Sequence, residues 1–458
     1  MQPRNMSEAC IHANIHVPLA DLPGFTQFRS ASEGPTRSRG LPIVVFIHGG
    51  GFAFGSGDAD LHGPEYLVSK RVIVITFNYR LNVMGFLSLN SSSIPGNNGL
   101  RDMVTLLRWV QRNARHFGGD PDNVTLAGQS AGASSAHLLS LSPAAKGLFR
   151  RVWSMSGVGL PIFFATAPAY SKFAATTFLA AMNINSTDPE LVHQQLIEAP
   201  IEKITAVNAY MLELFGLTTF MPTVESPHPG VTTILDDDPE VLLRKGRGKN
   251  VPLVVGFTNV ECETFRRRFE KVDIISQIKA NPLLVVSPQL LYTTPPAVLP
   301  GLANEIQDKY FNGVLNMDNF VKLCTDHYFV YPAMRLASLR AKTGGAPMYL
   351  YEFSYNNDNS VLKEAFDISY KGAAHIEDMT YLFRTNSILG NGSVYSPMKD
   401  TMTALFTNFM RTSNPSEGEW PAITKNNTQY HVIATPRHTY SQPLTDHLLD
   451  VRTFFDSI

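Results

Sequence analysis

The hydrophobic positions of this chain fall into short uninterrupted runs that alternate with segments of helical spacing. Residues 43–47 and 72–77 are apolar runs of the length expected for strands buried on both faces. Further strands are predicted at residues 123–127, 152–155, 252–256 and 348–353. Strands that alternate with helices are typical of an α/β fold with a mostly parallel sheet covered on both faces.

One helix is predicted clearly between the second and third strands. Its apolar side chains recur on one face at helical spacing, at Leu100, Met103, Val104, Leu107, Val110 and Ala114. Gly118 and Gly119 end this helix, and Asp120–Pro121 predicts a turn before the next strand.

Two long stretches interrupt the alternation of strands and helices. Residues 164–244 and 265–340 are largely helical, and we expect them to be insertions that roof the sheet. The chain has no internal repeat and no low-complexity linker, and the polar stretch of residues 30–40 is predicted to be a surface loop.

Charge and composition exclude some classes of protein. The 38 Lys and Arg residues balance 39 Asp and Glu residues, which argues against a nucleic-acid partner. Hydrophobic residues make up 44 % and charged residues 17 %, as in globular proteins. No apolar run is long enough for a transmembrane segment, and the first residues contain no signal peptide in the chain as given.

Glycosylation motifs and cysteines bear on the compartment, which stays uncertain. Six N-x-S/T acceptors suggest a glycoprotein on the secretory route, at Asn5, Asn90, Asn123, Asn185, Asn391 and Asn426. The three cysteines, Cys10, Cys262 and Cys324, fit no zinc motif and allow one disulfide at most.

The candidate nucleophile is Ser130, in the segment Gly128-Gln129-Ser130-Ala131-Gly132. The segment follows a predicted strand and precedes a predicted helix, which is the context of the G-x-S-x-G nucleophile elbow. The flanking glycines permit a turn so tight that a side chain there would clash. The serine hydroxyl is then exposed at the N-terminus of a helix, where the helix dipole favours developing negative charge.

A candidate oxyanion hole lies upstream, in His48-Gly49-Gly50-Gly51-Phe52. Consecutive glycines let backbone N–H groups converge on one point without blocking a substrate carbonyl. The N–H groups of this turn, with that of Ala131, would stabilise a tetrahedral oxyanion. A phosphate-binding loop is disfavoured because no Lys-Ser/Thr pair follows.

A serine nucleophile needs a base and an acid that orients it, and several residues compete for these roles. His375 lies in a loop of small residues, whereas His137 is on the helix of the nucleophile and His438 and His447 are in the polar C-terminal region. For the acid, Glu261 and its neighbour Glu263 both follow a predicted strand. Asp236-Asp237-Asp238 precedes a proline and is typical of a helix N-terminus.

Together these segments resemble the type-B carboxylesterase/cholinesterase family of α/β-hydrolases, over nearly the whole chain. The family's G-E/Q-S-A-G motif matches residues 128–132, and its G-x-T/N-x-x-E motif matches residues 256–261, which selects Glu261 over Glu263. Its G-x-x-H-x-x-E/D motif matches residues 372–378, which selects His375. The region from His48 to Gly157 is most similar to insect members, in particular lepidopteran carboxylesterases of the juvenile-hormone-esterase type.

The resemblance implies a fold, a reaction and a set of roles. We expect a single α/β-hydrolase domain over residues 1–458, with a Ser130–Glu261–His375 triad. The oxyanion hole would be Gly50, Gly51 and Ala131, and Ser156 would be a buried serine beside the triad. The family needs no metal or other cofactor, and its partner is a small-molecule ester.

The chain also departs from the family pattern. Family members begin earlier, with a signal peptide and N-terminal strands, and are typically secreted, so the chain looks truncated at its N-terminus. Cys10 resembles the second cysteine of the family's first disulfide, whose partner would lie in the missing part. Met103 follows Asp102 where many members have Gln.

The sequence thus predicts a serine carboxylesterase that forms an acyl-enzyme on Ser130. Juvenile hormone, odorant or pheromone acetates and xenobiotic esters all fit as substrates. The alternatives are a catalytically silent, cholinesterase-like binding or adhesion protein and an inactive truncated form. Aromatic side chains of the helical roof either line an acyl pocket or pack in the core, at Phe163, Phe164, Phe178, Tyr210, Phe215 and Phe220.

Overall fold

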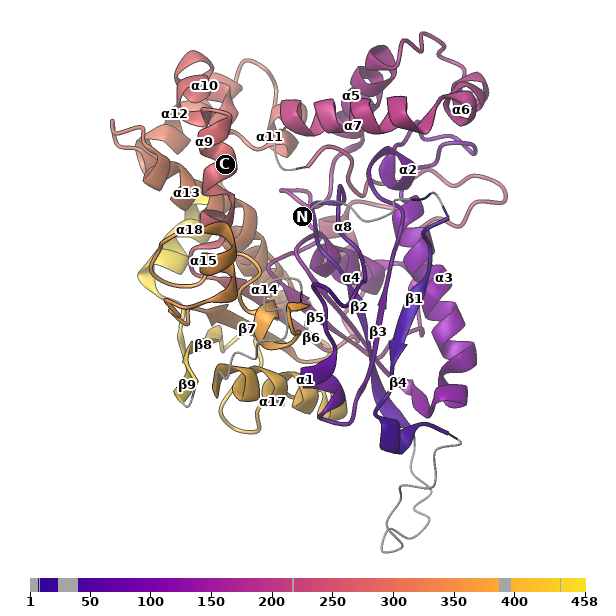
Figure 1. Cartoon of the computed structure of the whole chain (residues 1–458). Helices are drawn as coiled ribbons and strands as arrows, with labels where there is room; N and C mark the ends of the chain where they lie inside the picture. Colours follow the sequence, from indigo (N-terminus) through magenta and orange to yellow (C-terminus); the bar gives the residue numbers. More distant parts are fainter. Residues whose placement is uncertain (1–6, 8, 24–39, 216–217, 387–396, 437) are drawn as a thin grey trace, which may run out of the picture.

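The fold is built around one mixed β-sheet, shown in Figure 1. The computed structural model describes residues 7, 9–23, 40–215, 218–386, 397–436 and 438–458. In these residues one nine-stranded sheet has the order β1-β3-β2-β4-β5-β6-β7-β8-β9. Pairs from β3 to β8 are parallel, whereas β1 and β9 join the two edges antiparallel. The strands are β1 (Ala13–His16), β2 (Leu41–Ile47), β3 (Ile73–Phe77), β4 (Gly119–Gln129), β5 (Arg151–Met155), β6 (Leu253–Thr258), β7 (Met348–Phe353), β8 (Gln429–Thr435) and β9 (His438–Pro443).

Helices cover both faces and one end of the sheet. None of the described helices combines the length and the apolar character that crossing a bilayer requires. The α-helices are α1 (Glu65–Val68), α2 (Asn82–Phe86), α3 (Asn98–Asn113), α4 (Ala131–Leu141), α5 (Pro168–Ala181), α6 (Pro189–Glu198), α7 (Ile201–Phe215), α8 (Pro239–Arg244), α9 (Arg266–Lys271), α10 (Ile274–Ala280), α11 (Pro288–Thr293), α12 (Leu299–Tyr310), α13 (Met317–Thr325), α14 (Tyr331–Thr343), α15 (Val361–Phe366), α17 (Pro397–Thr412) and α18 (Asp446–Ser457). Two short turns matter for the site, the 3₁₀ turn η5 (Glu261–Phe265) and the π-helical turn η7 (Asp326–Val330).

Successive side chains of the central strands enter two separate hydrophobic cores. In β2, Ile43, Val45 and Ile47 belong to one core, and Val44 and Phe46 belong to the other. This alternation explains why the strand is apolar at every position, because both of its faces are buried. The predicted parallel sheet, covered on both faces, is confirmed.

Strand β4 begins earlier than the sequence predicts. Asp120 and Pro121, predicted to form a turn before the strand, lie inside β4. Leu41 pairs with Gly119 and Ile43 with Val124, so two steps along β2 face five steps along β4. The bend that Asp120–Pro121 predicts is therefore present, but as a bulge within a paired strand.

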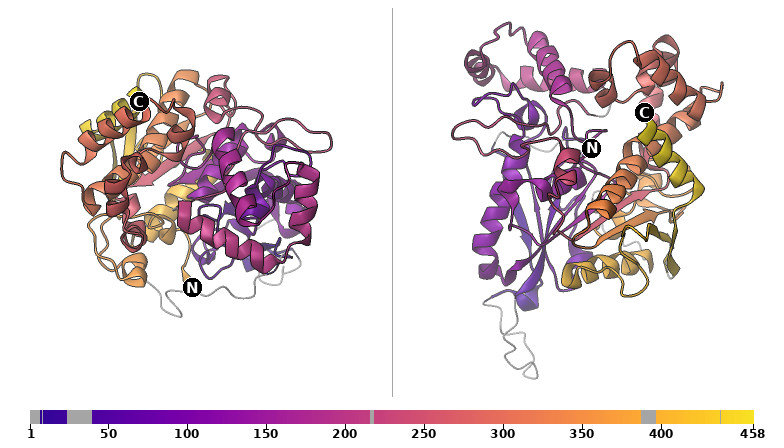
Figure 2. Two further views of the ribbon diagram at one scale, coloured as in Figure 1. Left: turned by 90° about the horizontal axis from the view of Figure 1, so that it is seen from above. Right: turned by 180° about the vertical axis from the view of Figure 1, so that it is seen from behind.

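The two helical stretches form a roof at one end of the sheet. Helices α5–α7 and α9–α13 stand in two neighbouring groups there, and the views from above and behind in Figure 2 agree. Two helices of these stretches do not belong to the roof: α14 packs on β6 and β7, and α8 packs on α4 and α14. The prediction of roofing insertions is confirmed for the remaining helices.

Some predictions fall on residues outside the described part of the chain. These are residues 30–39 of the expected surface loop and the acceptors Asn5 and Asn391. The side chain of Phe215 is likewise outside it.

A disulfide joins Cys262 of η5 to Cys324 near the end of α13. Both cysteines are buried, and the Cys262 N–H donates to Thr325 Oγ1 at 3.1 Å. The sequence allows one disulfide at most, and the structure identifies the pair. The bond fastens the segment that begins at Glu261 to the helix that leads into η7.

Replacing both Cys262 and Cys324 with Ala should lower the free energy of unfolding by about 2–4 kcal/mol, because the cross-link spans a long segment of chain. The two cysteines are 62 residues apart in sequence. Denaturant unfolding followed by circular dichroism measures the difference. C10A serves as the control, since Cys10 is not part of the pair. An unchanged free energy of unfolding in the double variant would contradict the expectation.

The C-terminal helix α18 packs against the other side of η7. His447 Nε2 lies 3.1 Å from Asp326 Oδ1, and the ring of Phe455 stacks on His327 at 4.2 Å between centroids. The hydrogen bond to Asp326 raises the pKa of His447 above its usual value. Protonated His447 therefore binds the buried carboxylate of Asp326 and holds α18 in place.

The contribution of His447 to stability should depend on pH. A raised pKa in the folded state means that the stabilisation is fully present below the unfolded pKa of about 6.5 and is lost as pH rises through the folded value. We expect H447Q to lower the melting temperature at pH 5.5 and to have less effect at pH 9, with H438Q as the exposed control. A difference in melting temperature that does not change with pH would contradict this expectation.

Candidate active site

Ser130 lies in a strained turn between β4 and α4. Its backbone angles are φ 59° and ψ −126°, a conformation that residues other than glycine rarely adopt. The Ser130 N–H donates to Met155 O at 2.8 Å, which fixes the turn to the end of β5. A side chain at Gly132 would overlap the Ile47 carbonyl, so only glycine lets α4 approach β2 this closely. The structure therefore forms the strand–turn–helix that the sequence predicts.

His375 and Glu261 form a buried pair on neighbouring loops. His375 Nδ1 lies 2.6 Å from Glu261 Oε2, and both side chains are almost completely inaccessible to solvent. Glu261 Oε1 accepts from the Thr258 N–H at 2.8 Å. The backbone N–H of His375 donates to the backbone carbonyl of Glu261 at 3.1 Å. Both carboxylate oxygens are thus occupied, which holds the acid in one orientation beside the ring.

The second ring nitrogen of His375 points toward the nucleophile turn. His375 Nε2 lies 3.0 Å from Gln129 Nε2, the side-chain amide of the residue before Ser130. An amide nitrogen donates, so this contact requires the tautomer in which Nε2 accepts and Nδ1 carries the proton that is donated to Glu261. Among the described residues, Ser130 Oγ makes no hydrogen bond to His375. The structure therefore joins His375 to Glu261 through Nδ1 and to the residue before Ser130 through Nε2.

The glycine turn after β2 lies directly against the nucleophile turn. A Cβ at Gly49 would be 2.9 Å from Ser130 Cβ, and Gly50 and Gly51 have φ of 110° and 60°. Tyr79 supports the turn from behind, since its hydroxyl donates to His48 O at 2.9 Å and its ring stacks on His48.

Three backbone donors are unused at this place. In the described part of the chain, the N–H groups of Gly50, Gly51 and Ala131 donate to no other group. Ala131 is the first residue of α4, where N–H groups have no partner within the helix. Unpaired donors of this kind suit an anion that forms only during a reaction.

Two phenylalanines that the sequence analysis missed pack on the His375 ring. Phe329 of η7 lies 4.8 Å from it and Phe265 of η5 lies 5.2 Å from it, between ring centroids. Phe265 is four residues after Glu261, and this short separation could have indicated that it lies near the site. Phe329 has no local signal, because the π-helical turn that presents it is set by tertiary packing.

The aromatic side chains that the sequence analysis assigned to the roof lie in three kinds of surroundings. Phe163 and Phe164 contact Phe329 and so belong to the surroundings of the site. Phe178 and Phe220 pack against each other in the core at 5.7 Å between centroids. Tyr210 is 56 % exposed, so it does not pack in the core, and the expectation that it lines an acyl pocket stays a prediction.

A second buried carboxylate lies close to the pair of His375 and Glu261. Asp378 accepts from the Tyr351 hydroxyl at 2.6 Å. Burial raises the pKa of Asp378 to about 6, although its hydrogen bond to Tyr351 opposes the change. The negative charge of nearby Glu261 raises the pKa of Asp378 as well. The sequence analysis included Asp378 only as the last residue of the histidine motif and predicted no role for it.

The competing candidates occupy other places. Glu263 pairs with Arg266 at 2.7 Å, and Asp238 caps the N-terminus of α8 as predicted. His137 is buried on α4 and accepts from the Gly159 N–H, and burial lowers its pKa to about 3. Ser156 follows β5, buried, with an Oγ that has no partner among the described residues. Its predicted role beside the triad stays a prediction.

No metal site is apparent in the described ranges. There, no three His, Cys, Asp or Glu side chains gather closely enough to hold a metal ion.

Comparison with known proteins places the chain in a family. A sequence profile of the carboxylesterase family matches residues 1–451. Juvenile hormone esterase of Heliothis virescens is 53 % identical over 469 residues, an alignment that covers 100 % of this chain and 81 % of that protein. Juvenile hormone esterase of Tribolium castaneum is 31 % identical over 434 residues, which cover 89 % of this chain and 71 % of that protein.

A solved structure shows the same fold. The crystal structure of juvenile hormone esterase from Manduca sexta, with OTFP covalently attached, matches with a TM-score of 0.94 at 54 % identity. The match covers 100 % of this chain and 85 % of that chain. The predicted α/β-hydrolase fold and the predicted resemblance are both confirmed. The chain therefore belongs to the carboxylesterase family and is a carboxylic ester hydrolase.

Proposed function

We propose that the chain hydrolyses esters with Ser130 as nucleophile, His375 as general base and Glu261 as the acid that orients the base. The observation that carries the proposal is the pair of contacts that the His375 ring makes. Nδ1 lies 2.6 Å from Glu261 Oε2, and Nε2 lies 3.0 Å from the side-chain amide of Gln129, the residue that precedes Ser130. A general base next to a serine needs this tautomer and this orientation.

The first half of the reaction forms an acyl-enzyme. His375 Nε2 turns from Gln129 to Ser130 and takes the hydroxyl proton as Oγ bonds to the ester carbonyl carbon. The carbonyl oxygen becomes an oxyanion that accepts from the N–H groups of Gly50, Gly51 and Ala131. The tetrahedral intermediate collapses, the bond to the alcohol oxygen breaks, and His375 gives that oxygen its proton.

The second half repeats these steps with water as the nucleophile. His375 removes a proton from water as its oxygen bonds to the acyl carbon, and the same N–H groups stabilise the second oxyanion. Collapse breaks the bond to Ser130 Oγ, which regains a proton from His375. The acid product leaves, and the steps use no metal or other cofactor.

We further propose an apolar substrate, with juvenile hormone favoured over odorant acetates and xenobiotic esters. Two relatives named as juvenile hormone esterases support this choice, at 53 % and 31 % identity. Phe265 and Phe329 pack on the His375 ring, and Phe163 and Phe164 pack on Phe329. These aromatic surroundings suit an apolar ester better than a charged one.

A diethyl phosphoryl inhibitor with a chromogenic leaving group should label Ser130 stoichiometrically. We expect one equivalent of leaving group per chain and an adduct on the peptide that contains Ser130, and none of either from S130A. Juvenile hormone should slow the labelling more than ethyl acetate does. No release from a chain that melts cooperatively would refute the proposal and favour a binding role or an inactive form.

The two neighbouring acids Glu261 and Glu263 allow a matched test of the triad. E261Q should lower kcat by about 10⁴-fold, because an amide in place of the carboxylate favours the wrong tautomer of His375. E263Q makes the same chemical change two residues away and should leave kcat nearly unchanged. Equal losses in the two variants, measured on correctly folded protein, would contradict the assignment of Glu261.

A further inference from the structure

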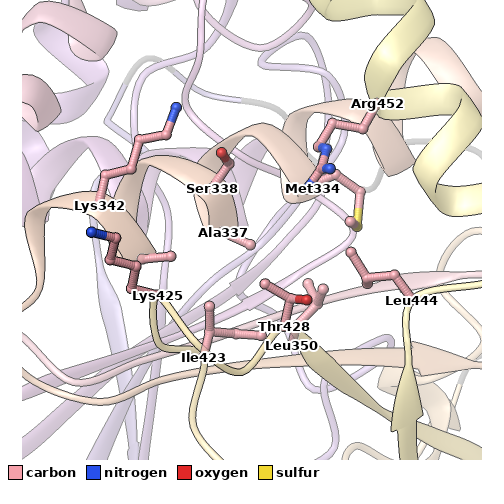
Figure 3. A pocket seen from close by; sticks show the side chains of 11 residues that line it. Met334, Ala337, Ser338, Lys342, Leu350, Ile423, Lys425, Thr428, Leu444 and Arg452 are labelled. Atoms are coloured by element: carbon pink, nitrogen blue, oxygen red, sulfur yellow. The ribbon is translucent and has the colours of Figure 1, made fainter.

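A cavity of about 210 Å³ lies away from Ser130 and His375, on the face of the sheet that α14 covers (Figure 3). We call it the basic slot. Its floor is apolar and is formed by Met334, Ala337, Leu350 and Ile423. The first two belong to α14, Leu350 to β7, and Ile423 to the segment before β8. Each of these four side chains is at most 8 % exposed.

The polar groups that line the basic slot are all capable of donating hydrogen bonds. They are the side chains of Ser338, Lys342, Lys425, Thr428 and Arg452. Three of the five are cations, and no carboxylate lines the slot. This is a local excess of positive charge in a chain whose formal net charge is −1.

These five polar side chains also lack partners within the described part of the chain. Within the described ranges, none of them makes an ion pair or a side-chain hydrogen bond. Elsewhere on the surface many cations are paired, for example Lys309 with Asp450 and Arg335 with Asp456. Unpaired donors around an apolar floor suit a ligand that brings acceptors and an apolar chain.

One end of the basic slot is suited to the negatively charged group of such a ligand. Ser338, Lys342 and Arg452 line both this slot and the open groove that adjoins it, so they form the mouth. Figure 3 shows Ser338 on α14 between Lys342 and Arg452. The one carboxylate of the adjoining groove, Asp456, is occupied by Arg335 at 2.9 Å and by the Tyr331 hydroxyl.

We propose that the basic slot binds an aliphatic carboxylate of medium chain length. The carboxylate lies at the mouth, where Arg452 and Lys342 pair with its charge and the Ser338 hydroxyl donates to it. The chain lies over Leu350 and Ile423. At about 210 Å³ the slot is smaller than the roughly 300–1,000 Å³ of sites for drug-sized ligands, which limits the length of the chain and excludes a folded partner.

This site is separate from the proposed triad and needs no residue of it. Its ligand has the chemistry of the acid that ester hydrolysis releases, so turnover itself supplies molecules of this class.

Calorimetric titration with octanoate tests the proposal, with acetate and octanol as probes that carry only the charge or only the chain. We expect octanoate to bind at least tenfold more tightly than either. R452Q and K342Q should each weaken octanoate binding about tenfold, whereas K279Q, the same charge change on exposed α10, should not. All variants should keep the rate of ester hydrolysis.

A further variant separates this slot from the catalytic site, which an acid product can also enter. A341W places a large ring beside the floor and should abolish octanoate binding while the cooperative melt and the hydrolysis rate remain. Octanoate binding that survives both A341W and R452Q would overturn the proposal, because the ligand would then be in the catalytic site. Equal affinities for octanol and octanoate would also overturn it.

Discussion

The proposed active site depends on how closely α4 approaches the ends of β2 and β5. Gly132 allows the contact with β2, and at Gly157 a side chain would overlap the Ser130 carbonyl. Between these two contacts the Ser130 backbone is held at a conformation that costs about 1–3 kcal/mol. The pairing of β4 with β2 and β5, buried on both faces, offsets that cost. A methyl group at either glycine would move the serine and the Ala131 N–H together.

Much of the site could be predicted because its signals are local. The nucleophile turn, the glycine turn and the histidine loop each need particular residues within a few positions, and the chain has them. The choice of Glu261 over Glu263 came only from the resemblance, since both follow the same strand. In the structure the choice has a physical basis: Glu261 points inward to His375, and Glu263 points to Arg266.

What could not be predicted depends on contacts between distant segments. No local pattern pairs Cys262 with Cys324 or places Phe329 on His375. The π-helical turn η7 brings Phe329 there because it is fixed on both sides, by the disulfide through α13 and by α18 through His447 and Phe455. Gln129 is similar: its position in the motif was evident, but its contact with His375 Nε2 was not.

The contacts of His375 also span long distances along the chain. Its ring joins Glu261, 114 residues away in sequence, and Gln129, 246 residues away. Loops of this size close slowly compared with local helix formation. A chain that had formed its helices but not these long-range contacts would give most of its circular dichroism signal and have no assembled site. Enzymatic activity consequently reports completion of the tertiary fold, and it should be the last signal to return when the unfolded chain is allowed to refold.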